Sequence, residues 1–270
     1  MLLAALGLAS ALAVGSLGQA LAEAETHFAR RAEAAHGATA DRAPVQASIA
    51  AYRRALGLDP GSAVARVGLL RALFFRGGFC GESDAARKQT FEEAKQLAAD
   101  SIERLELKLR GDPARRLDAL RRVPEAAALY FWAGVSWGQW SLDHKLASAW
   151  QGAASKIRDY AETAIVLDPN YEQGSPFLLL GRLHADSPKL PFVTGFVSRK
   201  KALESLRHAL EISPQNTIAQ YFLAGAILDY EPNNRDEAIR LLQACAHAAP
   251  RPDYRVEDLH YAELAQRRLR

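Results

Sequence analysis

PQNTIAQYFLAGAILDYEPNNRDEAIRLLQACAHAAP, residues 214–250, contains two helical patterns in succession. In the first, the aromatic Tyr221 is followed four positions later by Gly225. Glycine inside a helix is unfavourable by about 0.8–1 kcal/mol relative to alanine, so Gly225 indicates a neighbouring helix that approaches closely. In the second, the small residue Cys245 precedes Pro250 by five positions, and proline ends a helix because it has no backbone N–H to donate. The stretch predicts a helical hairpin.

Both patterns recur along the chain. The glycine pattern is found at Val64–Gly68, Tyr130–Gly134 and Phe177–Gly181. The proline pattern is found at Ala55–Pro60, Ala164–Pro169 and Ala209–Pro214. A small residue just before the end of a helix lets a second helix pack closely against it. The recurrence therefore predicts several helical hairpins in series.

These hairpins resemble the tetratricopeptide repeat (TPR), whose period of 34 residues is close to the 36 that separate Pro214 and Pro250. The resemblance implies an all-α fold, an α-solenoid of degenerate TPR-type helical hairpins. We expect a single domain over residues 23–270, most regular at 170–250, with a capping helix over about 257–269 on its open end. The sequence leaves open whether the array is continuous or divided near residues 111–113.

The N-terminus has the pattern of a secretory signal peptide. Residues 1–22 carry no charged side chain and include a long apolar run, and small residues at Ala20 and Ala22 precede Glu23. We therefore predict a signal peptide over residues 1–22 and a periplasmic or otherwise exported protein. The basic residues that usually begin such a peptide are missing, which leaves two alternatives: a membrane anchor formed by residues 2–22, or a cytoplasmic protein.

Aromatic residues gather in one predicted helix, and all four tryptophans of the chain lie between residues 130 and 150. Tyr130 and Trp137 share one face of this helix, whereas Trp132 projects elsewhere. A helix with aromatic side chains around its circumference is either central to the core or lines a cleft for a ligand or partner. The candidate binding residues in it are Tyr130, Trp132, Trp137 and Trp140.

A second candidate is the loop KLPFVTGF, residues 189–196, which is followed by the basic run 199–201. Apolar side chains are unusual in a loop. Phe192 and Phe196 either fold back over the preceding hairpin or form a docking site for a partner.

Catalytic chemistry finds little support. Gly134 to Gly138 match G-x-S-x-G, the pattern of a serine hydrolase that would use Ser136, but good helix formers precede Gly134 where that enzyme needs a strand. The seven histidines are scattered and two cysteines are too few for a four-cysteine metal site, so we expect no metal, no cofactor, and free thiols at Cys80 and Cys245. With 34 basic and 31 acidic residues, we expect no nucleic-acid partner.

The segment AALYFWAGVSWGQW, residues 127–140, resembles the aromatic helix of the T-component (TatT-like) proteins associated with tripartite ATP-independent periplasmic (TRAP) transporters. The resemblance implies an exported homo-oligomeric protein with an apolar cleft or channel, which meets the transporter's solute-binding subunit. No cysteine follows the apolar N-terminal run, so the lipid anchor of some members is not expected. We therefore predict a non-catalytic exported scaffold or ligand-handling protein that binds a protein partner or an apolar ligand. The alternative is a generic cytosolic TPR scaffold.

Overall fold

The computed structural model describes residues 2–109, 115–190 and 194–270, and these residues form helices and no β-strand. The α-helices are α1 (Leu2–Ala29), α2 (Arg42–Leu58), α3 (Ala63–Phe79), α4 (Asp84–Lys108), α5 (Arg116–Leu120), α6 (Ala126–Asp143), α7 (Lys145–Trp150), α8 (Ala153–Leu167), α9 (Tyr171–Asp186), α10 (Arg199–Ile212), α11 (Thr217–Tyr230), α12 (Arg235–His247) and α13 (Arg255–Leu269). Short 3₁₀ turns are η1 (Arg30–Ala32), η3 (Pro232–Asn234) and η4 (Pro252–Tyr254).

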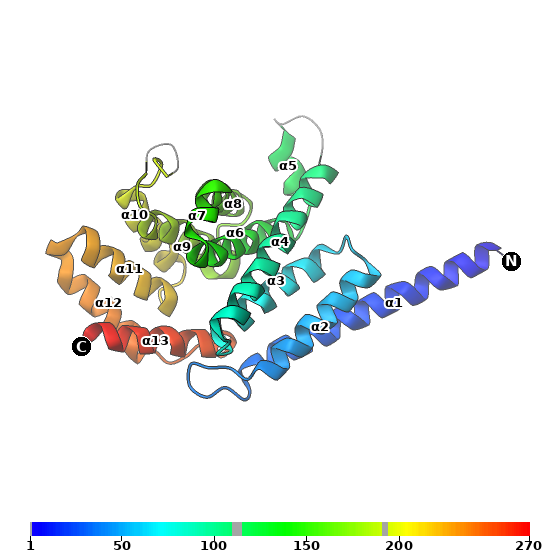
Figure 1. Ribbon diagram of the computed structural model, residues 1–270, viewed down its shortest axis with the longest axis horizontal. Coiled ribbons are helices and arrows are strands. Elements are labelled where there is room, and N and C mark those ends of the chain that lie inside the picture. The colour runs from blue at the N-terminus through cyan, green and yellow to red at the C-terminus, as the bar shows by residue number, and fades with distance from the viewer. Residues whose placement is uncertain (1, 110–114, 191–193) are drawn as a thin grey trace.

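Consecutive helices pack as antiparallel hairpins. The pairs are α1–α2, α3–α4, α6–α8, α9–α10 and α11–α12, and α13 packs on α12. Figure 1 shows these hairpins following one another along a curved path from the N-terminus to the C-terminus. The expected all-α solenoid of helical hairpins is confirmed. The possible division near residues 111–113 lies outside the described residues.

The helix ends follow the proline pattern. Helices α2, α8 and α10 each end two residues before a proline, and in each the first residue past the helix donates its N–H to the carbonyl of the small residue four before it. Those small residues, together with the cysteine of the last copy, are fully buried: Ala55, Ala164, Ala209 and Cys245. Their predicted role in close helix packing is confirmed.

Gly68 and Gly181 of the first helices also lie at close helix contacts, whereas Gly225, in the most regular copy, meets only the flexible end of the Arg268 side chain. A methyl group added at Gly68 would overlap the ring of Tyr52 on α2. One at Gly181 would lie 2.6 Å from Cγ of Leu206 on α10. Real side chains do not approach this closely, so these positions require glycine if the helices are to keep their separation.

The predicted capping helix is present, and the structure adds a contact between the two ends of the solenoid. Helix α13 caps α11 and α12 as predicted, but its first turns also reach α3, as Figure 1 shows. Arg31, just after α1, lies 3.5 Å from the Glu257 carboxylate and also donates a hydrogen bond to the carbonyl of Asp253. The ring of His260 meets that of Phe79 at 5.5 Å. The curvature of the solenoid therefore brings its two ends together.

The predicted signal peptide is part of a longer element. Helix α1 continues through the expected cleavage site after Ala22. Ala20 is buried, and Leu17 and Leu21 pack against the core. No helix in the described part of the chain combines the length and the apolar character that crossing a bilayer requires.

Replacing Gly68 with alanine should destabilise the protein by about 1–3 kcal/mol, because the buried ring of Tyr52 has no room to move. The matched variant Gly225→Ala meets only the end of the flexible Arg268 side chain, at 2.8 Å, and should be neutral or stabilising through helix propensity. Urea denaturation followed by circular dichroism measures both. Equal effects at the two positions would contradict the assignment of Gly68 to a rigid contact.

The Glu257 carboxylate makes stability depend on pH. Burial raises its pKa above the ordinary value, and Arg31 offsets only part of this effect. A raised pKa in the folded state means that proton binding to Glu257 favours folding. This favourable contribution to the free energy of unfolding is complete below the unfolded pKa of about 4.3, and it is lost as the pH rises through the pKa of the folded state. Glu257→Gln, neutral at every pH, should therefore be more stable than the wild type at pH 7.

The gain from Glu257→Gln should shrink towards pH 4, measured as the urea midpoint at each pH. The exposed Glu162→Gln variant is the control and should show no such trend. A wild type that is the more stable protein at pH 7 would show that Arg31 outweighs the burial of Glu257.

Candidate functional site

The concave side of the solenoid contains a half-open cavity of about 910 Å³. Its walls come from the first helices of successive hairpins, α1, α3, α6 and α9, with α8 behind them. Helix α7 and the loop after α9 form one rim, and η4 with the start of α13 forms another. The meeting of the two ends of the solenoid therefore helps to enclose this space.

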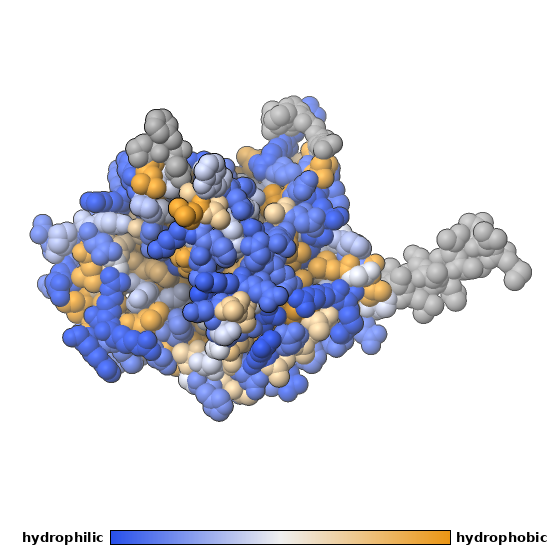
Figure 2. All heavy atoms as spheres, viewed as in Figure 1, coloured by the Kyte–Doolittle hydropathy of each residue, from blue (hydrophilic) through white to orange (hydrophobic). Residues whose placement is uncertain are grey.

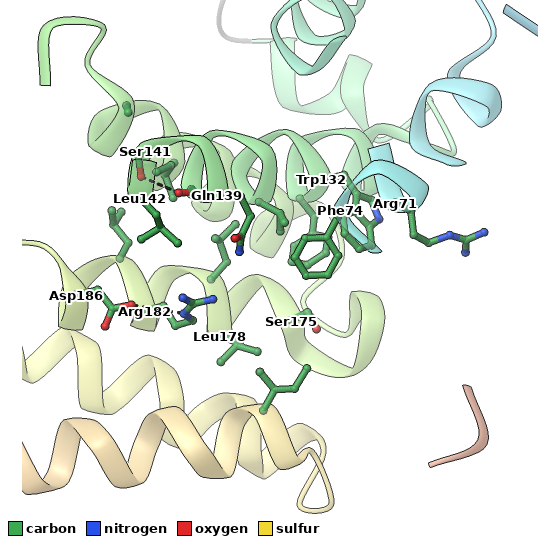
Figure 3. Close-up of a pocket in the computed structure, with 18 of the residues that line it drawn as sticks. Arg71, Phe74, Trp132, Gln139, Ser141, Leu142, Ser175, Leu178, Arg182 and Asp186 are labelled. Atoms are coloured by element: carbon green, nitrogen blue, oxygen red, sulfur yellow. Dashed lines mark hydrogen bonds and ion pairs between the residues drawn. The ribbon is translucent and has the colours of Figure 1, made fainter. Parts of the chain in front are cut away.

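Helix α6 divides its large side chains between the cavity and the core. Phe131, Trp132, Val135 and Gln139 line the cavity. In Figure 3, Trp132 and Gln139 project from α6 towards it. The opposite face packs against α4 and α8. Helix α6 is therefore part of the core on one side and lines the cavity on the other, so both alternatives for its aromatic residues apply.

Trp132 is fixed in the cavity wall by its neighbours. Its Nε1–H donates to the Tyr171 hydroxyl at 3.0 Å. The ring of Phe74 lies 5.5 Å from the Trp132 ring, and Phe131 lies 5.4 Å from Tyr171. Such tilted and edge-to-face aromatic pairs add to the stabilisation from burial. The wall is therefore formed before any ligand binds.

Three of the predicted site residues lie in the core instead of the cavity wall: Tyr130, Trp137 and Trp140. The indole of Trp140 donates to Glu92, and the Lys95 ammonium lies 4.0 Å from its ring centre. The hydroxyl of Tyr130 donates to Glu106. Whether any of these residues binds a ligand stays a prediction, but only Trp132 of the four has access to the cavity.

The predicted loop site is described only in part. Phe192 lies outside the described residues. Phe196 is half-buried, with its ring 6.0 Å from that of His184 and 4.4 Å from the guanidinium carbon of Arg158. This arrangement corresponds to the fold-back alternative, and a binding role for the loop stays a prediction.

Three arginines of the cavity wall each have a buried Nε–H without a hydrogen-bond partner: Arg31, Arg71 and Arg182. Arg71 is otherwise engaged, since it donates to both oxygens of Glu25 at 2.8 and 2.7 Å. Arg182 stacks over the ring of Phe222 at 3.9 Å, and its Nε lies 3.5 Å from an oxygen of Asp186. In Figure 3, Arg182 projects from α9 towards the facing helix α6. Buried donors without partners are rare, so Arg182 is a candidate contact for a ligand.

A strained turn begins α9 and was missed by the sequence analysis. Glu172, Gln173 and Gly174 all have left-handed backbones, with φ of 46°, 60° and 79°. Left-handed conformations are costly for non-glycine residues and persist only where the surroundings enforce them. Here Tyr254 donates to Glu172, and Arg251 donates to Gln173 at 2.7 Å. The turn therefore ties the cavity wall to η4, and the only local hint of it is the glycine at position 174.

Catalytic or metal chemistry has no support in the described residues. Ser136 lies inside α6 with helix on both sides, 2% exposed, and its hydroxyl donates to the carbonyl of Trp132. A hydrolase nucleophile instead needs a sharp turn after a strand. No group of metal-ligating side chains occurs in the described part of the chain. Burial raises the pKa of both free thiols, Cys80 and Cys245, to about 12, which favours the neutral thiol over the thiolate.

Comparison with known proteins places the fold among TPR structures. No family model matches the chain, and no curated protein is similar to it. Among solved structures, a thermophilic TPR protein of Thermus thermophilus is similar with a TM-score of 0.50 and 18% identity, over 83% of this chain and 91% of the other. YrrB, a TPR protein with an unusual peptide-binding site, is similar with a TM-score of 0.40 and 18% identity, over 83% and 84% of the two chains. The first similarity shows the TPR-type helical-repeat fold.

Proposed function

We propose that this protein is a non-catalytic scaffold that binds an extended segment of a partner protein in its concave cavity. The observation that carries the proposal is the composition of the cavity wall, in which apolar and hydrogen-bonding side chains stand side by side on the first helices. The volume of about 910 Å³ lies in the range of ligand pockets. Concave surfaces of solenoids are suited to extended ligands.

The polar groups of the wall match the main chain of a peptide. Arg182 offers donors, Asp186 offers an acceptor, and Gln139 offers both. Val135 and Leu178 line the same space and suit apolar side chains. A wholly apolar ligand would cover Gln139 and the Arg182–Asp186 ion pair without offering them any hydrogen bond, and a buried polar group left unpaired costs about 1–3 kcal/mol. A peptide satisfies both kinds of surface.

Panning a random peptide library against the protein tests this function. We expect enriched peptides with apolar side chains, and Val135→Asp should weaken the best of them at least about tenfold, equivalent to about 1.4 kcal/mol. Val166→Asp is the matched control, because Val166 is exposed on α8 and does not line the cavity. Gln139→Trp, which fills the cavity without burying a charge, should act like Val135→Asp. Enrichment that neither cavity variant reduces would place binding elsewhere.

The finer proposal is an exported accessory of a periplasmic solute transporter, whose partner is the solute-binding subunit. It is supported by the aromatic segment 127–140 and by the uncharged residues 1–22. Cleavage after Ala22 would remove Ala20 from the core but would keep the buried Ala24 and Phe28 in the mature chain. The mature protein would thus retain the side of α1 that closes the cavity.

Amino-terminal sequencing of the native protein in separated cell fractions tests export. We expect a periplasmic protein that begins at Glu23. A protein that begins at Met1 in the cytosol would contradict export, and one that begins at Met1 in the membrane fraction would indicate an uncleaved anchor. Immunoprecipitation from the periplasm should recover the solute-binding subunit with wild type and with Val166→Asp, but not with Val135→Asp.

A further inference from the structure

Helix α7 carries the most exposed apolar side chains in the described part of the chain. Trp150 is 91% exposed, Leu146 is 83% exposed, and Leu142, at the end of α6, is 52% exposed. The three residues are spaced four apart, and α7 itself has no buried residue. Burying such side chains is favourable, so a surface that leaves all three in water indicates an interaction site.

These side chains lie at the rim of the cavity. Leu142 and Leu146 line its edge, and so does Leu190 in the loop after α9, which is 47% exposed. Hydrogen bonds between Leu190 and Thr194, at 2.8 and 2.9 Å, hold this part of the loop. Helix α7 and the start of α10 lie on the same upper edge of the molecule in Figure 1, and Figure 2 shows apolar side chains on that edge. We call Leu142, Leu146, Trp150 and Leu190 the apolar rim.

Basic side chains surround the apolar rim. Lys145 precedes Leu146, Lys189 precedes Leu190, and all three basic residues of α10's first turn, 199–201, are exposed. The acidic side chains nearby are already engaged. Asp143 is held by two hydrogen bonds from Arg87 at 2.7 and 2.8 Å, and Glu204 pairs with Lys200 at 3.6 Å.

The positive charge of this edge favours an anionic membrane as the partner over a second copy of this chain. Exposed tryptophan and leucine flanked by lysine is the composition of interfacial membrane segments, in which the apolar groups enter the bilayer and the cations meet anionic headgroups. Each basic residue near such a surface adds to the electrostatic attraction. A second copy of this chain would instead bring its own basic residues against these, with like charges facing each other.

We propose that the apolar rim docks on an anionic lipid bilayer, with Trp150 and Leu146 inserted at the interface and Lys145 and Lys189 at the headgroups. In this orientation the α7 side of the cavity faces the membrane. The proposal does not depend on the peptide-binding function, because its evidence is the exposure and charge of the rim alone.

Fluorescence quenching by brominated lipid tests the docking with the full-length protein. Trp132, Trp137 and Trp140 are buried, so quenching in vesicles that contain phosphatidylserine should come from Trp150 and should be largely lost in Trp150→Phe. Quenching should fall several-fold with phosphatidylcholine alone or in high salt. The apolar residues 2–22 are present in every variant, so an anchor that they form cannot produce this difference.

Vesicle flotation with a matched pair of double variants completes the test. Leu146→Ser with Trp150→Ser should reduce binding to anionic vesicles at least about tenfold relative to Leu58→Ser with Val166→Ser, whose parent residues are 49% and 48% exposed away from the rim. Equal binding by both double variants, or no quenching of Trp150, would overturn the proposal. So would light scattering that shows a dimer in wild type and a monomer in the rim variant, because the rim would then join two copies.

Discussion

The architecture depends on how closely its helices can approach one another. Gly68 and Gly181 stand where any side chain would collide with Tyr52 or Leu206 on the adjoining helix. Glycine inside a helix disfavours helix formation. The stabilisation from the close helix contact must therefore outweigh the lower helix propensity of glycine at each of these positions. The resulting hairpins follow one another along a curved path (Figure 1). This curvature places the first helices on the concave side, where the cavity forms.

Curvature alone would leave a trough, and polar contacts between the two ends close one side of it. Arg31 meets Glu257, and Tyr254 meets Glu172 on the strained turn of α9. Pairs of buried charges contribute little net stability, because desolvation offsets much of their attraction. Their main effect is to fix one relative position of α1, α9 and α13. The shape of the cavity is thus set by interactions that specify geometry more than they stabilise the fold.

The sequence predicts the local features well and the distant ones poorly. Ends of helices, buried small residues and the close contacts of Gly68 and Gly181 follow from proline and glycine chemistry within one hairpin, and these were found, whereas Gly225 meets only the flexible end of Arg268. Arg31 and Glu257 are 226 residues apart, and no local pattern links them. The spacing of apolar residues also could not show which aromatic side chains of α6 face the core and which face the cavity, because this helix is apolar on all sides. Trp132 faces the cavity and Trp140 faces the core only because α9 and α4 lie on different sides of the helix.

The same all-round apolar character of α6 connects the core, the cavity and the rim. Its Trp140 side is stabilised by burial against α4, so the helix does not need a ligand to remain folded. Its Trp132 side lines the cavity, although Trp132 itself is only 7% exposed and packs against Phe74 and Tyr171. At its end, Leu142 continues the apolar surface outwards to α7, where polar side chains would have been equally compatible with folding. Folding explains the buried sides of α6, whereas Leu142 and the rest of the apolar rim keep apolar surface in water that folding alone leaves unused, and such surface is what a binding role requires.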